Sequence, residues 1–210
     1  MKILAIKAHP DDCELGCFGT LARHVYSKDE VYILSLSSGE KSYDPDIRKK
    51  EAREAAKIIG AKEIFFADLP ETMIHDDAST IGVIEEVIEK VNPKRIYTHT
   101  IHEKHQDHRN TAYATLSAGR YVPEILMYET PNTMETFSPQ YFVDITKFIE
   151  AKINAVKAHK SQMHKSYTRV ASIEGLARFR GYQSGLYMGE EKIISAEAFE
   201  VARIIKKWEE

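Results

Sequence analysis

The 210-residue chain lacks the features that would direct it to a membrane, to a signal-dependent export route or to nucleic acid. No run of about 18 apolar residues is present, so no membrane-spanning helix is expected, and the amino-terminal "MKILAIKA" is typical of a strand rather than of a secretory signal. The formal net charge of −3 provides no overall attraction to nucleic acid or to an anionic membrane. We therefore expect a cytoplasmic protein whose partner is a small molecule.

Cysteine is scarce, and its placement argues against a disulfide scaffold. Cys13 and Cys17 are the two cysteines, and we expect both on one helix, where their spacing is poor geometry for a disulfide. Two interpretations remain open: small residues on a helix face, or ligands of a metal ion.

Several common catalytic motifs are missing. Gly16 and Gly19 precede a predicted helix, but the G-x-G-x-x-G spacing and the G-K-[ST] ending of phosphate-binding loops are absent. The chain also lacks the G-x-S-x-G motif of serine hydrolases and the H-E-x-x-H motif of zincin proteases. Any catalytic chemistry must therefore come from other residues.

Hydrophobic periodicity predicts one α/β domain over residues 1–210. Hydrophobic residues make up 43% and charged residues 29%, which is typical of a soluble globular chain. Helices are expected at 46–60, ending at Gly60, and at 79–92, starting on a Ser/Thr cap. Apolar runs predict strands at residues 2–8, 31–37, 63–67, 94–99 and 124–129.

Alternating strands and helices favour right-handed crossovers and a mostly parallel, Rossmann-like sheet flanked by helices. For such a sheet we expect the strand order 3-2-1-4-5. Residues 145–162 predict one long amphipathic helix, whereas residues 195–203 fit either a helix or a strand.

Two polar clusters interrupt this pattern. The first is "AHPDD", in which His9, Asp11 and Asp12 follow the first predicted strand. Helix capping would need only one of the two aspartates and would not explain the histidine. The second is "THTIHEKHQDHRNT", in which Asp107 lies among four histidines: His99, His102, His105 and His108. For any one of these histidines alone, an exposed polar loop is the simpler interpretation.

The expected topology brings the two clusters together. Strands 1 and 4 are neighbours in the predicted order, and ligands bind outside the carboxyl ends of the strands at such a switch point. Imidazoles and a carboxylate are good ligands for Zn²⁺, and three of them leave a position open for water. A further carboxylate beside that water can act as a general base, and a further histidine as a general acid.

The two clusters resemble the paired signatures of the PIG-L/LmbE family of zinc-dependent de-N-acetylases. "AHPDDCELGCFGT" is similar to the family's AHPDD signature and "HQDH" to its H-x-D-H signature, with weaker similarity in "DIRKKEAREAAKIIG", "AHKSQ" and "AEAF". The resemblance implies a Rossmann-like core with a small C-terminal part closing the pocket. It also implies metal ligation by His9, Asp12 and His108.

The same resemblance implies roles for four further residues. Asp11 would be the base that activates water, and His105 the acid or the positive charge beside the tetrahedral intermediate. Asp107 would hold the ring of His105, and Arg48 would contact substrate. His99 and His102 match no family position.

Phe18-Gly19 stands where the family usually has Gly-Gly, so we expect the Phe18 ring to narrow or redirect the pocket. Three tyrosines could stack on a sugar face, although boundary packing explains tyrosines in an α/β domain equally well; they are Tyr43, Tyr97 and Tyr128. Because members of the family often assemble, a homo-oligomer is also expected.

The function that follows is zinc-dependent hydrolysis of an acetamido group on an N-acetylglucosamine-type sugar or sugar conjugate, releasing acetate and the free amine. Two alternatives remain at this stage. One is a metal-dependent amidase that acts on a non-sugar conjugate. The other is a nucleotide- or sugar-binding module without catalysis, in which the histidines form a surface loop.

Overall fold

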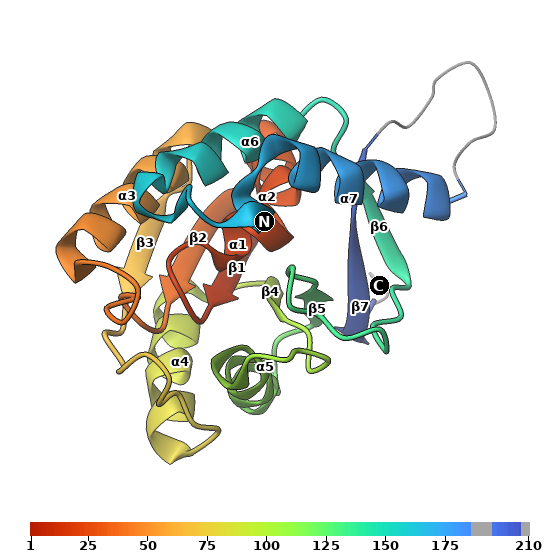
Figure 1. Cartoon of the computed structure of the whole chain (residues 1–210). Helices are drawn as coiled ribbons and strands as arrows, with labels where there is room; N and C mark the ends of the chain where they lie inside the picture. Colours follow the sequence, from red (N-terminus) through yellow and green to blue (C-terminus); the bar gives the residue numbers. More distant parts are fainter. Residues whose placement is uncertain (186–194, 207–210) are drawn as a thin grey trace.

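The computed structural model describes residues 1–185 and 195–206, which form a single seven-stranded sheet in the order β3-β2-β1-β4-β5-β7-β6 (Figure 1). The first five strands are parallel, whereas β7 is antiparallel to both β5 and β6. The predicted fold class and the order of the first five strands are therefore confirmed. The strands are β1 (Lys2–Lys7), β2 (Glu30–Ser35), β3 (Glu63–Phe66), β4 (Arg95–His99), β5 (Glu124–Tyr128), β6 (Tyr141–Asp144) and β7 (Ala196–Ile204).

Helices cover both faces of the sheet. The helices α2, α3, α6 and α7 pack with α1 on one face, and α4 and α5 cover the other (Figure 1). No helix in the described parts of the chain is both long enough and apolar enough to cross a membrane. The helices are α1 (Asp12–Gly16), α2 (Phe18–Tyr26), α3 (Pro45–Ile59), α4 (Ala78–Val91), α5 (Gln106–Ala118), α6 (Ile149–Ala158) and α7 (Val170–Gln183).

The ends of α3 and α4 follow local chemistry. The side chain of Asp44 accepts the first free N–H groups of α3, and Gly60 ends the helix in the left-handed region with φ of 76°. The Ser/Thr cap predicted for α4 is wrong, because Asp77 occupies that position and accepts the N–H of Thr80.

The helix predicted to carry both cysteines is broken at Cys17, where α1 ends and α2 begins. Close packing against β5 accompanies the break: a Cβ on Gly16 would lie 2.2 Å from the ring of Tyr128. Both cysteines are free and buried, and the thiol of Cys13 lies 3.6 Å from the hydroxyl of Tyr128. They are therefore packing residues between α1 and the sheet.

The long helix predicted at 145–162 is shorter in the structure. It comprises α6 and a separate 3-10 turn at Lys160–Gln162. The residues before α6 cannot join it because the N–H of Ile145 bonds to the carbonyl of Ser195. The ambiguous segment 195–203 lies in strand β7, where Phe199 is fully buried between β5 and β6.

Candidate metal centre

A buried ion pair shapes the turn that follows β1. Lys7 is fully buried, and its ammonium group donates to the carbonyl of Pro10 and to both carboxylate oxygens of Glu14. The other side of Glu14 faces His159, with Nε2 3.3 Å from Oε1. These contacts fix the turn that carries the first polar cluster. This support was not predicted, although its signal in the sequence is a lysine that ends an otherwise apolar strand.

The second cluster lies on the amino-terminal end of α5. His105 occupies the N-cap position, and its Nδ1 accepts the backbone N–H of Asp107 at 3.2 Å. Asp107 and His108 follow in the first turn of the helix. Because β1 and β4 pair in parallel, this turn lies beside the loop after β1. The structure thus brings together the two clusters, as expected from the topology.

Three donor groups converge where the clusters meet. Nδ1 of His9 lies 3.1 Å from Nε2 of His108, and each nitrogen lies 3.4 Å from one oxygen of Asp12. Ligand atoms bound at about 2.1 Å to one tetrahedral metal ion are about 3.4 Å apart. The spacing and the chemistry of the donor set therefore fit a metal ion.

Each converging histidine is held by a carboxylate on its other nitrogen, a common arrangement for metal ligands. Nε2 of His9 lies 3.1 Å from Asp107, and Nδ1 of His108 lies 3.2 Å from Glu103. Glu103 is fully buried, and it also accepts the hydroxyls of Thr130 and Thr133 at 2.6 Å each. Glu103 was not predicted as a site residue, although it is a carboxylate within the histidine-rich loop.

Asp107 occupies a different place from the one expected. Its carboxylate was predicted to hold the ring of His105, but it contacts His9 and the N–H of Thr72 instead. Only the backbone of Asp107 reaches the His105 ring. The reason is geometric, because Asp107 is in the first turn of α5, from where its carboxylate reaches His9 and the N–H of Thr72.

Asp11 and Arg48 form a buried ion pair beside the donor groups. A guanidinium nitrogen of Arg48 donates to Asp11 at 2.7 Å, and the Arg48 side chain is only 1% exposed. Asp11 occupies the N-cap position of α1, yet its side chain caps no N–H group, so capping does not explain it. The Nε and Nη1 groups of Arg48 have no hydrogen-bond partner within the described residues.

Gly39 makes room for Arg48. It adopts a φ of 71°, and a Cβ there would lie 2.7 Å from the Nε of Arg48. A larger residue here would strain the backbone and crowd the guanidinium, so glycine lets the loop after β2 close over Arg48.

The charges of the site shift several pKa values. Burial alone would raise the pKa of Asp11, but the charge of Arg48 outweighs it and lowers the pKa to about 2. Burial would lower the pKa of His9, but Asp12 and Asp107 raise it to about 10. Burial would also lower the pKa of His108, but the charge of Asp12 raises it to about 9. Four buried carboxylates exceed the positive charges of Arg48 and of protonated His9 and His108, so the site is net negative and favours a cation; the carboxylates are Asp11, Asp12, Glu103 and Asp107.

The remaining histidines of the cluster differ in position. His99 is fully buried and stacks on His108 with ring centroids 4.0 Å apart. Its Nε2 lies 3.1 Å from Asp12, and burial lowers its pKa to about 4. His102 lies away from the donor groups, where it contacts Thr136 and Glu200.

A pocket of about 100 Å³ opens over these groups, and its lining includes both aspartates of the first cluster, Arg48, His105 and Tyr167. The expectation that Phe18 narrows the pocket is wrong, because Phe18 begins α2 and its ring is fully buried in the core. Tyr97 and Tyr128 are also fully buried and act as packing residues, whereas Tyr43 is 49% exposed.

Comparison with known proteins places the chain in a family. It matches the family described as GlcNAc-PI de-N-acetylase (PIG-L) over residues 4–119. It is 36% identical over 167 residues to the uncharacterized deacetylase YaiS of Escherichia coli, covering 76% of this chain and 90% of that protein. The chain belongs to the PIG-L family and is an enzyme of the deacetylase class.

Two further similarities show the range of related proteins. The chain is 28% identical over 186 residues to a diacetylchitobiose deacetylase of Thermococcus kodakarensis, covering 77% of this chain and 70% of that one. The solved structure of the 4-carboxy-2-hydroxymuconate hydratase GalB of Pseudomonas putida has the same fold, with a TM-score of 0.85, 22% identity and coverage of 99% of both chains.

Proposed function

We propose that this enzyme is a zinc-dependent de-N-acetylase that removes acetate from an N-acetylglucosamine-type sugar or conjugate. The convergence of one nitrogen from His9, one from His108 and the carboxylate of Asp12 at the base of a pocket carries this proposal. Two imidazoles and a carboxylate are a common ligand set of catalytic zinc, with one position left for water. A bound zinc ion would supply a water whose pKa is lowered toward neutrality.

Asp11 is the group that accepts a proton from the attacking water. Arg48 holds the pKa of Asp11 at about 2, so this carboxyl is ionised at neutral pH. The ion pair also fixes which oxygen faces Arg48 and which faces the pocket. Asp11 directly precedes the ligand Asp12 and lines the same pocket, where a general base for the attacking water is needed.

His105 stabilises charge on the carbonyl oxygen of the substrate. Its Nδ1 accepts the N–H of Asp107, so in the neutral ring the proton resides on Nε2. Burial, together with the nearby rings of His9 and His108, lowers the pKa of His105 and favours this neutral form. The Nε2–H group therefore acts as a hydrogen-bond donor from the wall of the pocket, and one such donor is typically worth about 3–4 kcal/mol in the transition state.

Arg48 is also our candidate for a substrate contact. Its Nε and Nη1 nitrogens have no partner in the described structure, and the residue lines the pocket. A guanidinium among the lining residues suits a sugar, whose hydroxyls are hydrogen-bond acceptors. The relationship to a diacetylchitobiose deacetylase supports a sugar amide as the substrate.

The test is release of acetate from a panel of N-acetylglucosaminyl compounds by the zinc-loaded enzyme. We expect chelator-sensitive release, with zinc content near one per chain. His108→Ala should lose the stoichiometric metal and about a thousandfold or more in kcat/KM. Release of acids other than acetate from non-sugar amides would favour the wider amidase class instead. A metal-loaded enzyme that releases no acid but hydrates an unsaturated carboxylic acid would contradict the proposal.

A further inference from the structure

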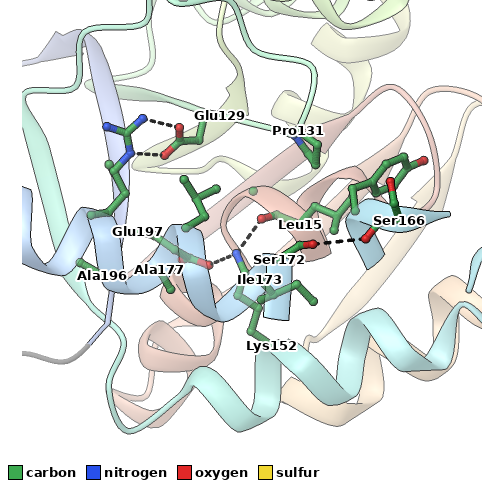
Figure 2. A pocket seen from close by; sticks show the side chains of 15 residues that line it. Leu15, Glu129, Pro131, Lys152, Ser166, Ser172, Ile173, Ala177, Ala196 and Glu197 are labelled. Carbon is green, nitrogen blue, oxygen red and sulfur yellow. Dashed lines mark hydrogen bonds and ion pairs between the residues drawn. The ribbon is translucent and has the colours of Figure 1, made fainter. Parts of the chain in front are cut away.

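A second cavity adjoins the metal centre. Its volume is about 330 Å³, against about 100 Å³ for the pocket over the metal ligands, and the two share Leu15, Pro131 and Tyr167 as lining residues. Residues of α7 and β7 form the far walls (Figure 2). A volume of this size lies within the range of small-molecule binding sites.

One side of the cavity contains Lys152, whose charge is paired with a glutamate. The ammonium group of Lys152 donates to the carbonyl of Leu15 at 2.7 Å and to Glu197 at 2.6 Å (Figure 2). Glu197 in turn accepts the N–H groups of Gly19 and Thr20, at 3.0 and 2.7 Å, at the start of α2. This pair therefore ties α6 and β7 to the helix that follows the metal-binding loop.

The second ion pair is equally complete. Arg180 donates from two nitrogens to the two oxygens of Glu129, at 2.7 and 2.5 Å, and a third nitrogen bonds to Gln183. All four charged residues that line the cavity in the described structure are thus neutralised by one another. A charged ligand would find no unpaired counter-ion here, and separating either partly buried pair would be costly.

The rest of the lining is mainly apolar. Tyr167 adds an aromatic ring, and its hydroxyl has its pKa raised by burial and by the nearby charges of Asp11 and Asp12. The side chain of Tyr167 therefore separates the apolar cavity from the charged metal centre. The aliphatic lining residues are Leu15, Ile173, Leu176, Ala177, Ala196 and Ala198.

We propose that this cavity binds the acyl side of the substrate, so that the enzyme hydrolyses N-acyl groups of medium chain length in preference to acetyl. The inference rests on the proposed function, because it assumes that the scissile amide lies over the metal ligands. An amide has one acyl and one amine substituent. The pocket residues Ser42, Arg48 and Glu71 provide polar groups for the hydroxyls of the amine-side sugar. The apolar cavity, reached past Leu15 and Tyr167, then suits the hydrocarbon chain.

The chemistry is ordinary amide hydrolysis. Water adds to the acyl carbon, the C–N bond breaks, and the products are a fatty acid and the amino sugar. A chain that remained in solvent would contribute nothing to binding. Each methylene buried in the cavity contributes about a fourfold gain in affinity.

The main experiment compares kcat/KM for glucosamine carrying N-acetyl, N-butanoyl, N-hexanoyl or N-octanoyl groups, measured by appearance of the free amine with zinc-loaded enzyme. We expect a rise of about tenfold to a few hundredfold from acetyl to hexanoyl, the upper value applying if all four added methylenes are buried. Octyl N-acetylglucosaminide, which carries its hydrocarbon chain on the aglycone and not on the acyl group, tests the alternative occupant of the cavity. A gain with this glycoside and none with longer N-acyl groups would place the aglycone in the cavity and overturn the proposal.

A matched pair of variants tests whether the chain-length preference in kcat/KM arises in this cavity. Ala177→Phe fills the cavity from α7 and should reduce the octanoyl-to-acetyl ratio of kcat/KM about tenfold. Ala171→Phe makes the same change on the exposed face of the same helix and should leave the ratio unchanged. Because Ala177 is buried, Leu176→Trp serves as the second variant at a half-buried lining position. An unchanged ratio in folded Ala177→Phe and Leu176→Trp would contradict the assignment.

A binding measurement separates this inference from the proposed function. Calorimetry should show octanoate binding to the zinc-loaded protein at least about tenfold more tightly than acetate, with the difference lost in Ala177→Phe. This result does not require turnover. Equal binding of octanoate and acetate would overturn the acyl site even if acetate release proceeds. Octanoate binding without hydrolysis of any N-acyl sugar would instead retain the site and contradict the proposed reaction.

Discussion

The metal centre and the apolar cavity share lining residues, but they differ in how completely their buried charges are paired. At the metal centre, four buried carboxylates outnumber the one guanidinium, and polar atoms such as Nε of Arg48 and Oδ1 of Asp107 have no partner in the described structure. In the cavity, Lys152 and Arg180 are each paired with a glutamate. Buried charged residues therefore indicate a reactive site where their charges are incompletely neutralised, and a structural role where they are fully paired.

The two regions also differ in how the chain assembles them. Six of the seven predicted site residues come from two short runs of sequence, one after β1 and one at the start of α5. The lining of the cavity comes from α1, α6, α7, β7 and the loops between them. The following predictions test whether the regions are separable, from the largest expected effect to the smallest.

The largest effect should follow Asp11→Asn. Loss of the base should reduce kcat about a hundredfold to ten-thousandfold, equally for N-acetyl and N-octanoyl substrates, with zinc retained. Steady-state kinetics and metal analysis provide the measurements. Because the change leaves Arg48 without a charged partner, thermal melting must show that the variant is folded. Asp76→Asn, on an exposed loop, is the matched control, and full activity of metal-loaded Asp11→Asn would remove Asp11 from the mechanism.

Glu103→Gln should act on the metal centre alone. Weakening the contact with Nδ1 of His108 should lower zinc affinity about tenfold to a hundredfold, measured by competition with a chelating dye. At saturating zinc, the preference for chain length should not change. The exposed Glu135→Gln is the control. An altered octanoyl-to-acetyl ratio would show that the two regions are coupled.

Gly16→Ala should disturb both regions, because α1 carries the ligand Asp12 and the shared lining residue Leu15. The added Cβ would collide with the ring of Tyr128 in a tightly packed core, so we expect a loss of about 1–3 kcal/mol in the free energy of unfolding. Chemical denaturation is the measurement. Gly82→Ala, where nothing lies within 4 Å, is the control. Equal stability of the two variants would contradict this packing.

The smallest effect should come from Gly175→Ala on α7. A Cβ there meets nothing within 4 Å, so the helix should gain about 0.5–1 kcal/mol and Tm should rise by about 1–3 °C. Catalytic constants should remain at the wild-type values for every chain length. A shift in the chain-length profile would show that the whole of α7, and not only its lining residues, sets the cavity.

Much of the architecture was predictable because its signals are local. Apolar runs and intervening amphipathic helices defined the five parallel strands, and the usual arrangement of a doubly wound sheet supplied their order. His9 and His108 could be expected to meet because each lies near the carboxyl end of a neighbouring strand. In contrast, the length of α6, the break at Cys17 and the state of residues 195–203 depended on packing that no local pattern encodes.

By itself, the sequence determined the α/β class, the order of the first five strands and the two clusters that meet at the metal centre, since strand polarity places such clusters at one sheet edge. Only the tertiary structure decided which partner each polar group has. Asp107 faces His9, Glu103 supports His108 and Arg48 pairs with Asp11. It also decided that the cavity beside the metal centre is apolar, because its walls come from segments far apart in the chain and become neighbours only when β7 joins the sheet.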